Sequence, residues 1–151
     1  KVLLAVDDSP YAKHLLDIVC RRHWPKDVEF KLLHVIEPLD LDCYNQEEAR
    51  ELSMQVRHLR EKYAEKLCAE ARLRLEKHFP DARVHFELRR GKAKNEIVAS
   101  AAEWEANRIL IGAHGRAVCP HNRLGSVSQA VAERAHCSVE VIRVSSKHSD
   151  S

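Results

Sequence analysis

The sequence predicts an α/β protein: a single domain built on an open parallel sheet with helices on both faces. Short apolar runs alternate with segments of helical periodicity along the 151 residues, and such alternation favours parallel strands joined by right-handed crossovers. Hydrophobic residues make up 44% of the chain and charged residues 32%, as is typical of folded globular proteins. The net charge of +2 gives no indication of a nucleic-acid partner.

The first half of the chain contributes two strands and two helices. The expected elements are a strand at 1–8, a helix at 9–24, a strand at 28–38, a loop at 39–45 and a helix at 46–78. The first strand is an apolar run that ends in two carboxylates, as expected of a strand buried on both faces. Ser9 is placed to be the N-cap of the first helix, with Pro10 at its first helical position. Pro38 stops the second strand.

The long helix carries one amphipathic stripe of apolar residues at spacings of three or four. Its members are Leu52, Val56, Leu59, Tyr63, Leu67, Ala71 and Leu75. A stripe with this period is more often part of the core than a surface for a partner. We therefore expect it to pack on the sheet.

The second half completes the alternation. The expected elements are strands at 83–90, 107–115 and 138–144 and helices at 93–106 and 126–136. The strand at 83–90 alternates apolar and polar residues, which indicates a position near an edge of the sheet. The domain is expected to end at 144, followed by a polar C-terminal tail at 145–151.

Cysteine usage and hydropathy indicate a soluble, cytoplasmic protein. The five cysteines form no C-x-x-C pair, so we expect reduced structural thiols. No run is apolar for the ~18 residues that a membrane span needs. The chain begins at Lys1 rather than Met, which leaves open a trimmed domain or a lost leader.

Three of the four glycines lie between a predicted strand and a predicted helix, in the stretch 112–128. Gly112, Gly115 and Gly125 allow backbone amides to approach a phosphate, and the helix start favours an anion. Arg116 adds positive charge, and Ser126 is suited to capping the helix, donating to a phosphate, or both. A simple turn is the alternative, but loops of this length tend to be functional. The stretch contains neither G-x-G-x-x-G nor G-x-x-x-x-G-K-[ST].

Ligands of such folds lie beyond the carboxyl ends of the strands, at the point where strand order reverses. This rule draws attention to Asp7, Val35 and Gly112. We expect Asp7 to contact a ligand rather than only form a turn, and Asp8 to cap the following helix. His114 is one of ten scattered histidines, so its place in the loop is at least as well explained by coincidence.

The spacing Gly112-x2-Gly115-x9-Gly125-Ser126 resembles the G-2x-G-9x-G-[S/T] signature of ATP-binding universal stress proteins. Segments 1–12, 32–38, 89–116 and 132–144 resemble the same family, so the resemblance leaves out only the stretch 39–80. It implies an adenine nucleotide alpha hydrolase-like fold with five parallel strands in the order 3-2-1-4-5. It also implies a homodimer through the last strand, Ser138 to Val144.

The resemblance implies the roles of the site residues as well. Asp7 would contact the ribose, and the backbone of Val35 would read the adenine. The ribose and phosphates would be held by Gly112, Gly115, Gly125, Ser126 and Val127, with Mg²⁺ accompanying the phosphates. The sequence departs from the family at Ala113, where a hydroxyl residue is frequent, and at Pro120 within the loop.

The expected function is that of a nucleotide-dependent regulatory or stress-response protein that binds ATP, or ADP or AMP. Hydrolysis would be slow at most, because no base is evident to activate water, and Ser126 or Ser128 would be the nearest candidates for autophosphorylation. The alternative is a dimeric interaction module of the same fold that binds no nucleotide. A pyrophosphatase-like ligase is weaker, since the first strand lacks a glycine-rich turn.

Overall fold

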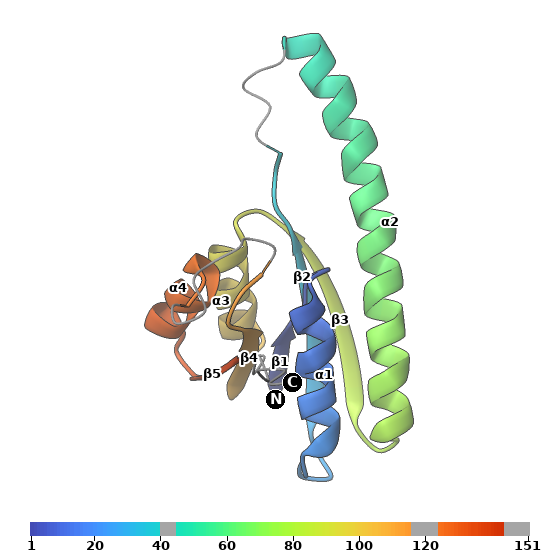
Figure 1. The fold of residues 1–151 in the computed structure, drawn as a ribbon. Helices are drawn as coiled ribbons and strands as arrows, with labels where there is room; N and C mark the ends of the chain where they lie inside the picture. The colour runs from blue at the N-terminus through green and yellow to red at the C-terminus, as the bar shows by residue number, and fades with distance from the viewer. Residues whose placement is uncertain (40–44, 116–123, 144–151) are drawn as a thin grey trace, which may run out of the picture.

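The computed structural model describes residues 1–39, 45–115 and 124–143 (Figure 1). The described residues form β1 (Val2–Ala5), α1 (Pro10–Arg21), β2 (Glu29–Ile36), α2 (Gln46–His78), β3 (Arg83–Arg90), α3 (Ala93–Glu103), β4 (Arg108–Gly112), α4 (Ser126–Arg134) and β5 (Ser138–Ile142). All strand pairs are parallel, in the order β3-β2-β1-β4-β5. The predicted fold class and strand order are therefore confirmed. The predicted tail at 145–151 lies outside the described residues.

The sheet separates two layers of helices, with α1 and α2 on one face and α3 and α4 on the other (Figure 1). Adjacent residues of β1 belong to different cores: Leu4 packs with Phe30 under α1 and α2, and Leu3 packs with Ile109 under α3 and α4. All four side chains are fully buried. Successive residues of a strand face opposite sides of a sheet, so this pattern confirms a first strand buried on both faces.

Two expectations about helix starts need correction. Ser9 does occupy the N-cap of α1 with Pro10 next to it, but the Ser9 side chain makes no capping hydrogen bond. The N-cap position therefore belongs to Ser9 and not to Asp8. At α4 the N-cap is Gly125, and Ser126 is already the first helical residue. Glycine is accepted at an N-cap because the position needs extended backbone rather than a particular side chain.

The prediction of one core-facing stripe on α2 is wrong for the first half of the helix. Ala64, Cys68, Ala71 and Leu75 are buried, whereas the side chains of Leu59 and Tyr63 are 66% and 54% exposed. The cause is length. A helix of 33 residues measures about 50 Å, whereas the eight residues of β2 extend over roughly 27 Å. The sheet cannot cover the whole helix, and the first half of α2 runs past it (Figure 1).

Candidate functional site

A crevice of about 720 Å³ opens at the carboxyl ends of β1, β2 and β4. It lies where the chain order of the strands reverses, with β2 on one side of β1 and β4 on the other. The crevice brings together the residues predicted from the sequence, namely Asp7, Val35, Gly112, Gly115, Gly125, Ser126 and Val127. Arg116 and Pro120 lie outside the described residues.

The backbone of Val35 points toward the space beyond β1. Residues of a parallel strand direct their N–H and C=O groups to the two neighbouring strands in turn. The carbonyl of Leu33 accepts from Val6 on the β1 side at 2.9 Å, and that of Ile36 accepts from Gly91 on the β3 side at 3.1 Å. Val35 therefore faces the β1 side, where β1 has ended at Ala5. No backbone hydrogen bond joins Val35 to the described residues that follow Ala5.

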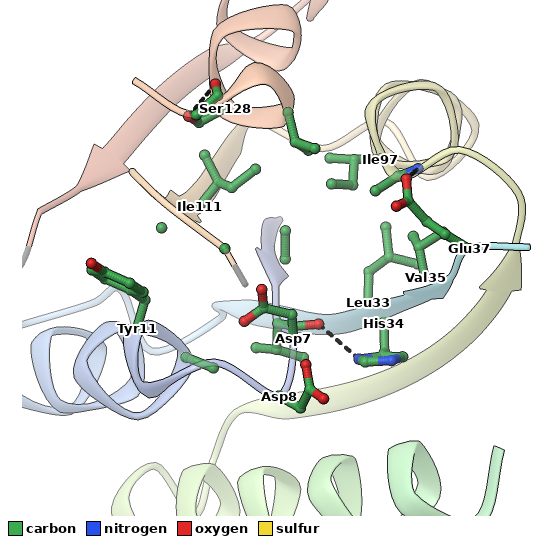
Figure 2. A pocket seen from close by; sticks show the side chains of 18 of the residues that line it. Asp7, Asp8, Tyr11, Leu33, His34, Val35, Glu37, Ile97, Ile111 and Ser128 are labelled. Carbon is green, nitrogen blue, oxygen red and sulfur yellow. Dashed lines mark hydrogen bonds between the residues drawn. The ribbon is translucent and has the colours of Figure 1, made fainter. Parts of the chain in front are cut away.

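His34 explains in part why the backbone of Val35 makes no hydrogen bond to the described residues after β1. Its Nδ1 donates to the carbonyl oxygen of Val6 at 2.9 Å, the bond that Figure 2 shows below Asp7. That carbonyl is the group that a continuing parallel ladder would offer to the N–H of Val35. The buried imidazole thus occupies the end of β1 and leaves an edge of β2 available to a ligand.

An apolar space adjoins this edge. Leu33, Val35, Ile97 and Ile111 gather around it in Figure 2, and Val127 at the start of α4 completes its lining. These side chains continue the core beneath α3 and α4. A flat apolar group with polar edges fits here, since its face meets aliphatic carbons and its rim meets the Val35 backbone.

Asp7 and Asp8 leave the end of β1 in different directions (Figure 2). Oδ1 of Asp7 accepts the Ser9 N–H at 3.0 Å and also the Ser9 hydroxyl. Asp7 is therefore itself the residue that forms the turn before α1. Its Oδ2 faces Gly115, where an added Cβ would lie only 3.1 Å from that oxygen. Asp7 is thus held by the turn and presents its second oxygen to the glycine loop.

The two ends of the glycine loop are fastened together at the crevice. The Gly125 N–H donates to the carbonyl of Ala113 at 2.8 Å, and the Ser128 hydroxyl is 2.9 Å from the same oxygen. A Cβ on Gly125 would lie 3.1 Å from that carbonyl, so the close approach favours glycine. We call this closure the neck. It places the N-terminus of α4 at the crevice wall, and the first N–H groups of a helix have no partner within the helix.

The two serines expected as candidates for autophosphorylation, Ser126 and Ser128, differ in their accessibility because of the neck. Ser128 is buried, and its hydroxyl is directed to the carbonyls of Ala113 and Gly125. Ser126 is exposed. Only Ser126 is therefore accessible to a phosphoryl donor without opening the neck.

His114 is a candidate that sequence reasoning undervalued. Its Nδ1 is buried and has no hydrogen-bond partner among the residues that the structure describes, and its ring meets that of Tyr11 edge-on at 5.8 Å. A buried polar atom without a partner is costly unless a ligand or water satisfies it. The signal available in the sequence was the position of His114 between Gly112 and Gly115.

Glu37, Arg60 and Tyr63 also line the crevice and were not anticipated. The Glu37 carboxylate accepts the N–H of Ala93 at 2.8 Å, which caps α3 from a distance. The Glu37 carbonyl accepts from Arg60 of α2 at 2.9 Å. Arg60 and Tyr63 belong to the stretch 39–80, for which no resemblance gave guidance.

Other candidate chemistry is sparse in the part of the chain that the structure describes. Residues 1–39, 45–115 and 124–143 contain no group of three or more His, Cys, Asp or Glu placed to hold a metal ion. Cys20, Cys68 and Cys137 are free thiols, and burial raises the pKa of Cys68 to about 12. Over the same residues, no helix has the length and apolar character needed to cross a membrane.

Comparisons with known proteins point to one family. The model of the universal stress protein family matches residues 1–143. A universal stress protein of Methanocaldococcus jannaschii, MJ0531, is 36% identical over 61 residues, which are 40% of this chain and 36% of that protein. A universal stress protein of Mycolicibacterium smegmatis is 29% identical over 152 residues, covering 94% of this chain and 45% of that protein. The matched parts thus span less than half the length of these curated relatives.

Solved structures agree on the fold. The structure of the hypothetical protein MJ0577 has a TM-score of 0.82 at 24% identity and covers 97% of both chains. Two further structures were solved with a nucleotide. One is a universal stress protein in complex with cAMP, with a TM-score of 0.65, 16% identity and coverage of 95% and 96%. The other is that of Archaeoglobus fulgidus in complex with dAMP, with a TM-score of 0.59, 20% identity and coverage of 93% and 95%.

Proposed function

The chain belongs to the universal stress protein family, and from this premise we propose that it is a regulatory protein that binds an adenine nucleotide, foremost ATP, in the crevice between β1 and β4. One observation carries the proposal. The crevice joins an unpaired strand edge, a carboxylate and a glycine loop that ends at a helix N-terminus. The relatives in complex with cAMP and dAMP support the choice of an adenine nucleotide.

The base would occupy the apolar space beside Val35. Adenine has a flat face and an edge that carries adjacent donor and acceptor groups. The face would contact Leu33, Ile97 and Ile111, and the edge would bond to the N–H and C=O of Val35. Recognition through the backbone leaves the side chain at that position free to vary.

The ribose and phosphates would extend from Asp7 toward α4. Oδ2 of Asp7 is available for a ribose hydroxyl, since the Ser9 turn uses Oδ1. The phosphates would lie along Gly112, Gly115 and Gly125, at the N–H groups that begin α4. The buried Nδ1 of His114, which has no partner in the described part of the chain, would gain one there.

Magnesium would accompany the phosphates rather than occupy a site of its own. Mg²⁺ binds through phosphate oxygens and retained waters together with one or two carboxylates, and Oδ2 of Asp7 lies at the start of the glycine loop, 3.1 Å from a Cβ built on Gly115. Turnover would be slow. Asp7 is already engaged by Ser9, which leaves it poorly suited to take a proton from water.

Isothermal titration calorimetry of ATP with and without Mg²⁺ tests the proposal. We expect a Kd on the order of micromolar, or about −8 kcal/mol. Gly115→Val would lose at least about tenfold in affinity, or 1.4 kcal/mol, because its side chain meets Oδ2 of Asp7 and fills the phosphate space. Asp7→Asn retains the acceptor for Ser9 but removes the charge, so it would weaken binding less.

Asp27→Asn is the matched control, because it makes the same chemical change just before β2, at the opposite end of the sheet from the crevice. Its affinity should equal that of the parent. Thermal unfolding of each variant shows whether the fold is kept. If the folded parent binds neither ATP, ADP, AMP nor cAMP, the nucleotide proposal fails, and the interaction module becomes the better description.

The alternating direction of backbone groups along a strand, used above for Val35, also supports a homodimer through β5. The carbonyl of Ile142 accepts from Ala113 on the β4 side at 2.7 Å, so Val139 and Val141 direct their backbone groups away from the sheet. β5 lies at the edge of the sheet. A second copy would pair with this edge, and the dimer is common to both functional alternatives.

A further inference from the structure

Exposed apolar side chains concentrate on α2. Of the five large hydrophobic residues exposed among the described ones, four belong to this helix: Met54, Leu59, Tyr63 and Leu73. Exposed apolar residues are ordinary when scattered, but a contiguous row of them marks a surface that binds something.

The apolar residues of α2 form two separate stripes rather than one. The first, which we call the outer stripe, consists of the half-buried Leu52 and Val56 and the exposed Leu59 and Tyr63. The second consists of the buried residues Ala64, Cys68, Ala71 and Leu75. At about 100° per residue, the two stripes lie roughly a third of a turn apart around the helix axis. A helix that packs one stripe on the sheet therefore leaves the outer stripe facing elsewhere.

The half of α2 that carries the outer stripe is also the half that projects from the sheet (Figure 1). Going along the helix, the first side chains bonded to other elements among the described residues are Arg60, which donates to Glu37, and Glu61, which is paired with Arg90. The side chains of α2 before Arg60 are therefore available for contact with a partner.

We propose that the outer stripe is the interface for a second copy of this chain, paired as two antiparallel α2 helices. Ala49, Leu52, Val56, Leu59 and Tyr63 follow one another at spacings of three, four, three and four. This is the repeat of helix pairs that interlock along a narrow apolar seam. The packed half of α2 has the same spacing at 64, 68, 71 and 75, but on the side of the helix that faces the sheet.

The charges of α2 select the antiparallel direction. Residues 47–51 contain three glutamates and one arginine, a net charge of −2, whereas residues 57–62 contain two arginines, one lysine and one glutamate, a net charge of +2. Antiparallel helices set the acidic segment of one copy against the basic segment of the other. Parallel helices would align like charges, and they would also bring the two sheet domains to the same end.

The apolar seam fixes the register. Pairing Leu52 with the partner's Val56 places Ala49 against the partner's Leu59. In an antiparallel pair, the positions that flank the seam then set Glu48 against the partner's Lys62 and, by symmetry, Lys62 against the partner's Glu48. These two ion pairs give the proposal a test that depends on direction and register.

Sedimentation equilibrium over a wide range of concentration measures the association. All variants are made in a chain that also carries Val139→Pro. This substitution removes an outward N–H of β5 and so blocks the other proposed interface. Association through α2 would persist there. Leu59→Glu would weaken it more than about tenfold, because two carboxylates would be buried in each pair. Met54→Glu is the matched control, since Met54 is 51% exposed but lies on another side of α2.

Charge reversal tests the register. Glu48→Lys and Lys62→Glu would each weaken the association by setting like charges against each other, and the double variant would restore it. Should Val139→Pro fail to fold, the same series in the parent chain would change the mass from four copies to two. Three outcomes would each overturn the proposal. The chain with Val139→Pro would be monomeric at all concentrations, Leu59→Glu and Met54→Glu would have equal effects, or the double charge reversal would associate no better than the single ones.

Discussion

The two edge strands of the sheet are built in opposite ways. β3 has eight residues, of which Arg83, His85, Glu87, Arg89 and Arg90 are ionisable. β5 has five residues, of which Glu140 is the sole ionisable one. Within the described residues, each of the two strands has a neighbouring strand on one side only, but charged side chains along an edge oppose the approach of a further strand.

The charges of β3 are also organised. Glu87 receives hydrogen bonds from Lys31 at 2.9 Å, from Ser100 at 2.6 Å and from Arg89 at 2.5 Å, and Arg89 continues to Glu103 of α3. This network ties the edge to β2 and α3. On β5, Glu140 is engaged by Arg22 at the C-terminus of α1, which leaves Val139 and Val141 to define the edge. The difference supports the proposal that a second copy pairs with β5 and not with β3.

The largest expected effect is on assembly. In the parent chain, Val139→Pro removes an N–H that would bond to a second copy, and light scattering should show loss of the β5 interface, with half the mass of the parent assembly. Val139→Ala is the matched control, because it also loses side-chain packing but keeps the N–H. A proline variant with the mass of the alanine variant would show that β5 is a protected edge as well.

The next effect concerns the stability of β3. Glu87→Gln keeps the shape and an acceptor but removes the charge that Lys31 and Arg89 share. These cations are only 13% and 17% exposed, so we expect a loss of about 2 kcal/mol in the free energy of unfolding. Urea unfolding at pH 7 measures it. Glu76→Gln, in the exposed Arg72–Glu76 pair of α2, serves as the control and should cost below about 0.5 kcal/mol.

The sequence carried most of what defines the edges and the crevice. Alternation along 83–90 indicated an edge strand, and the glycine spacing located the loop, because both depend on local residue order. The roles of Asp7 and of the outer stripe depend on three-dimensional context instead. The Asp7 turn is set by the orientation of Ser9, and the stripe of α2 divides because the sheet is shorter than the helix. Arg60 and Glu37 meet across 23 positions of chain, a contact that no local pattern specifies.

The smallest effect is the pH dependence of the β3 network. Burial raises the pKa of Glu87, but the hydrogen bonds from Ser100, Lys31 and Arg89 outweigh it and lower the value from 4.5 to about 2. Because the folded state holds the lowered pKa, this carboxylate stabilises the protein fully above the unfolded pKa near 4.5. Its contribution is lost as the pH falls toward 2.

Between pH 5 and pH 3 the parent should therefore lose about 1 kcal/mol more than Glu87→Gln, after allowance for solvent screening. The two unfolding free energies would converge in acid, since Gln has no proton to gain. Urea unfolding at pH 7, 5, 4 and 3 gives both curves, and the other carboxylates with lowered pKa, such as Glu140, contribute equally to each. Parallel curves would mean that Glu87 contributes by shape rather than by charge, and the protection of the β3 edge would then rest on its other ionisable residues, Arg83, His85, Arg89 and Arg90.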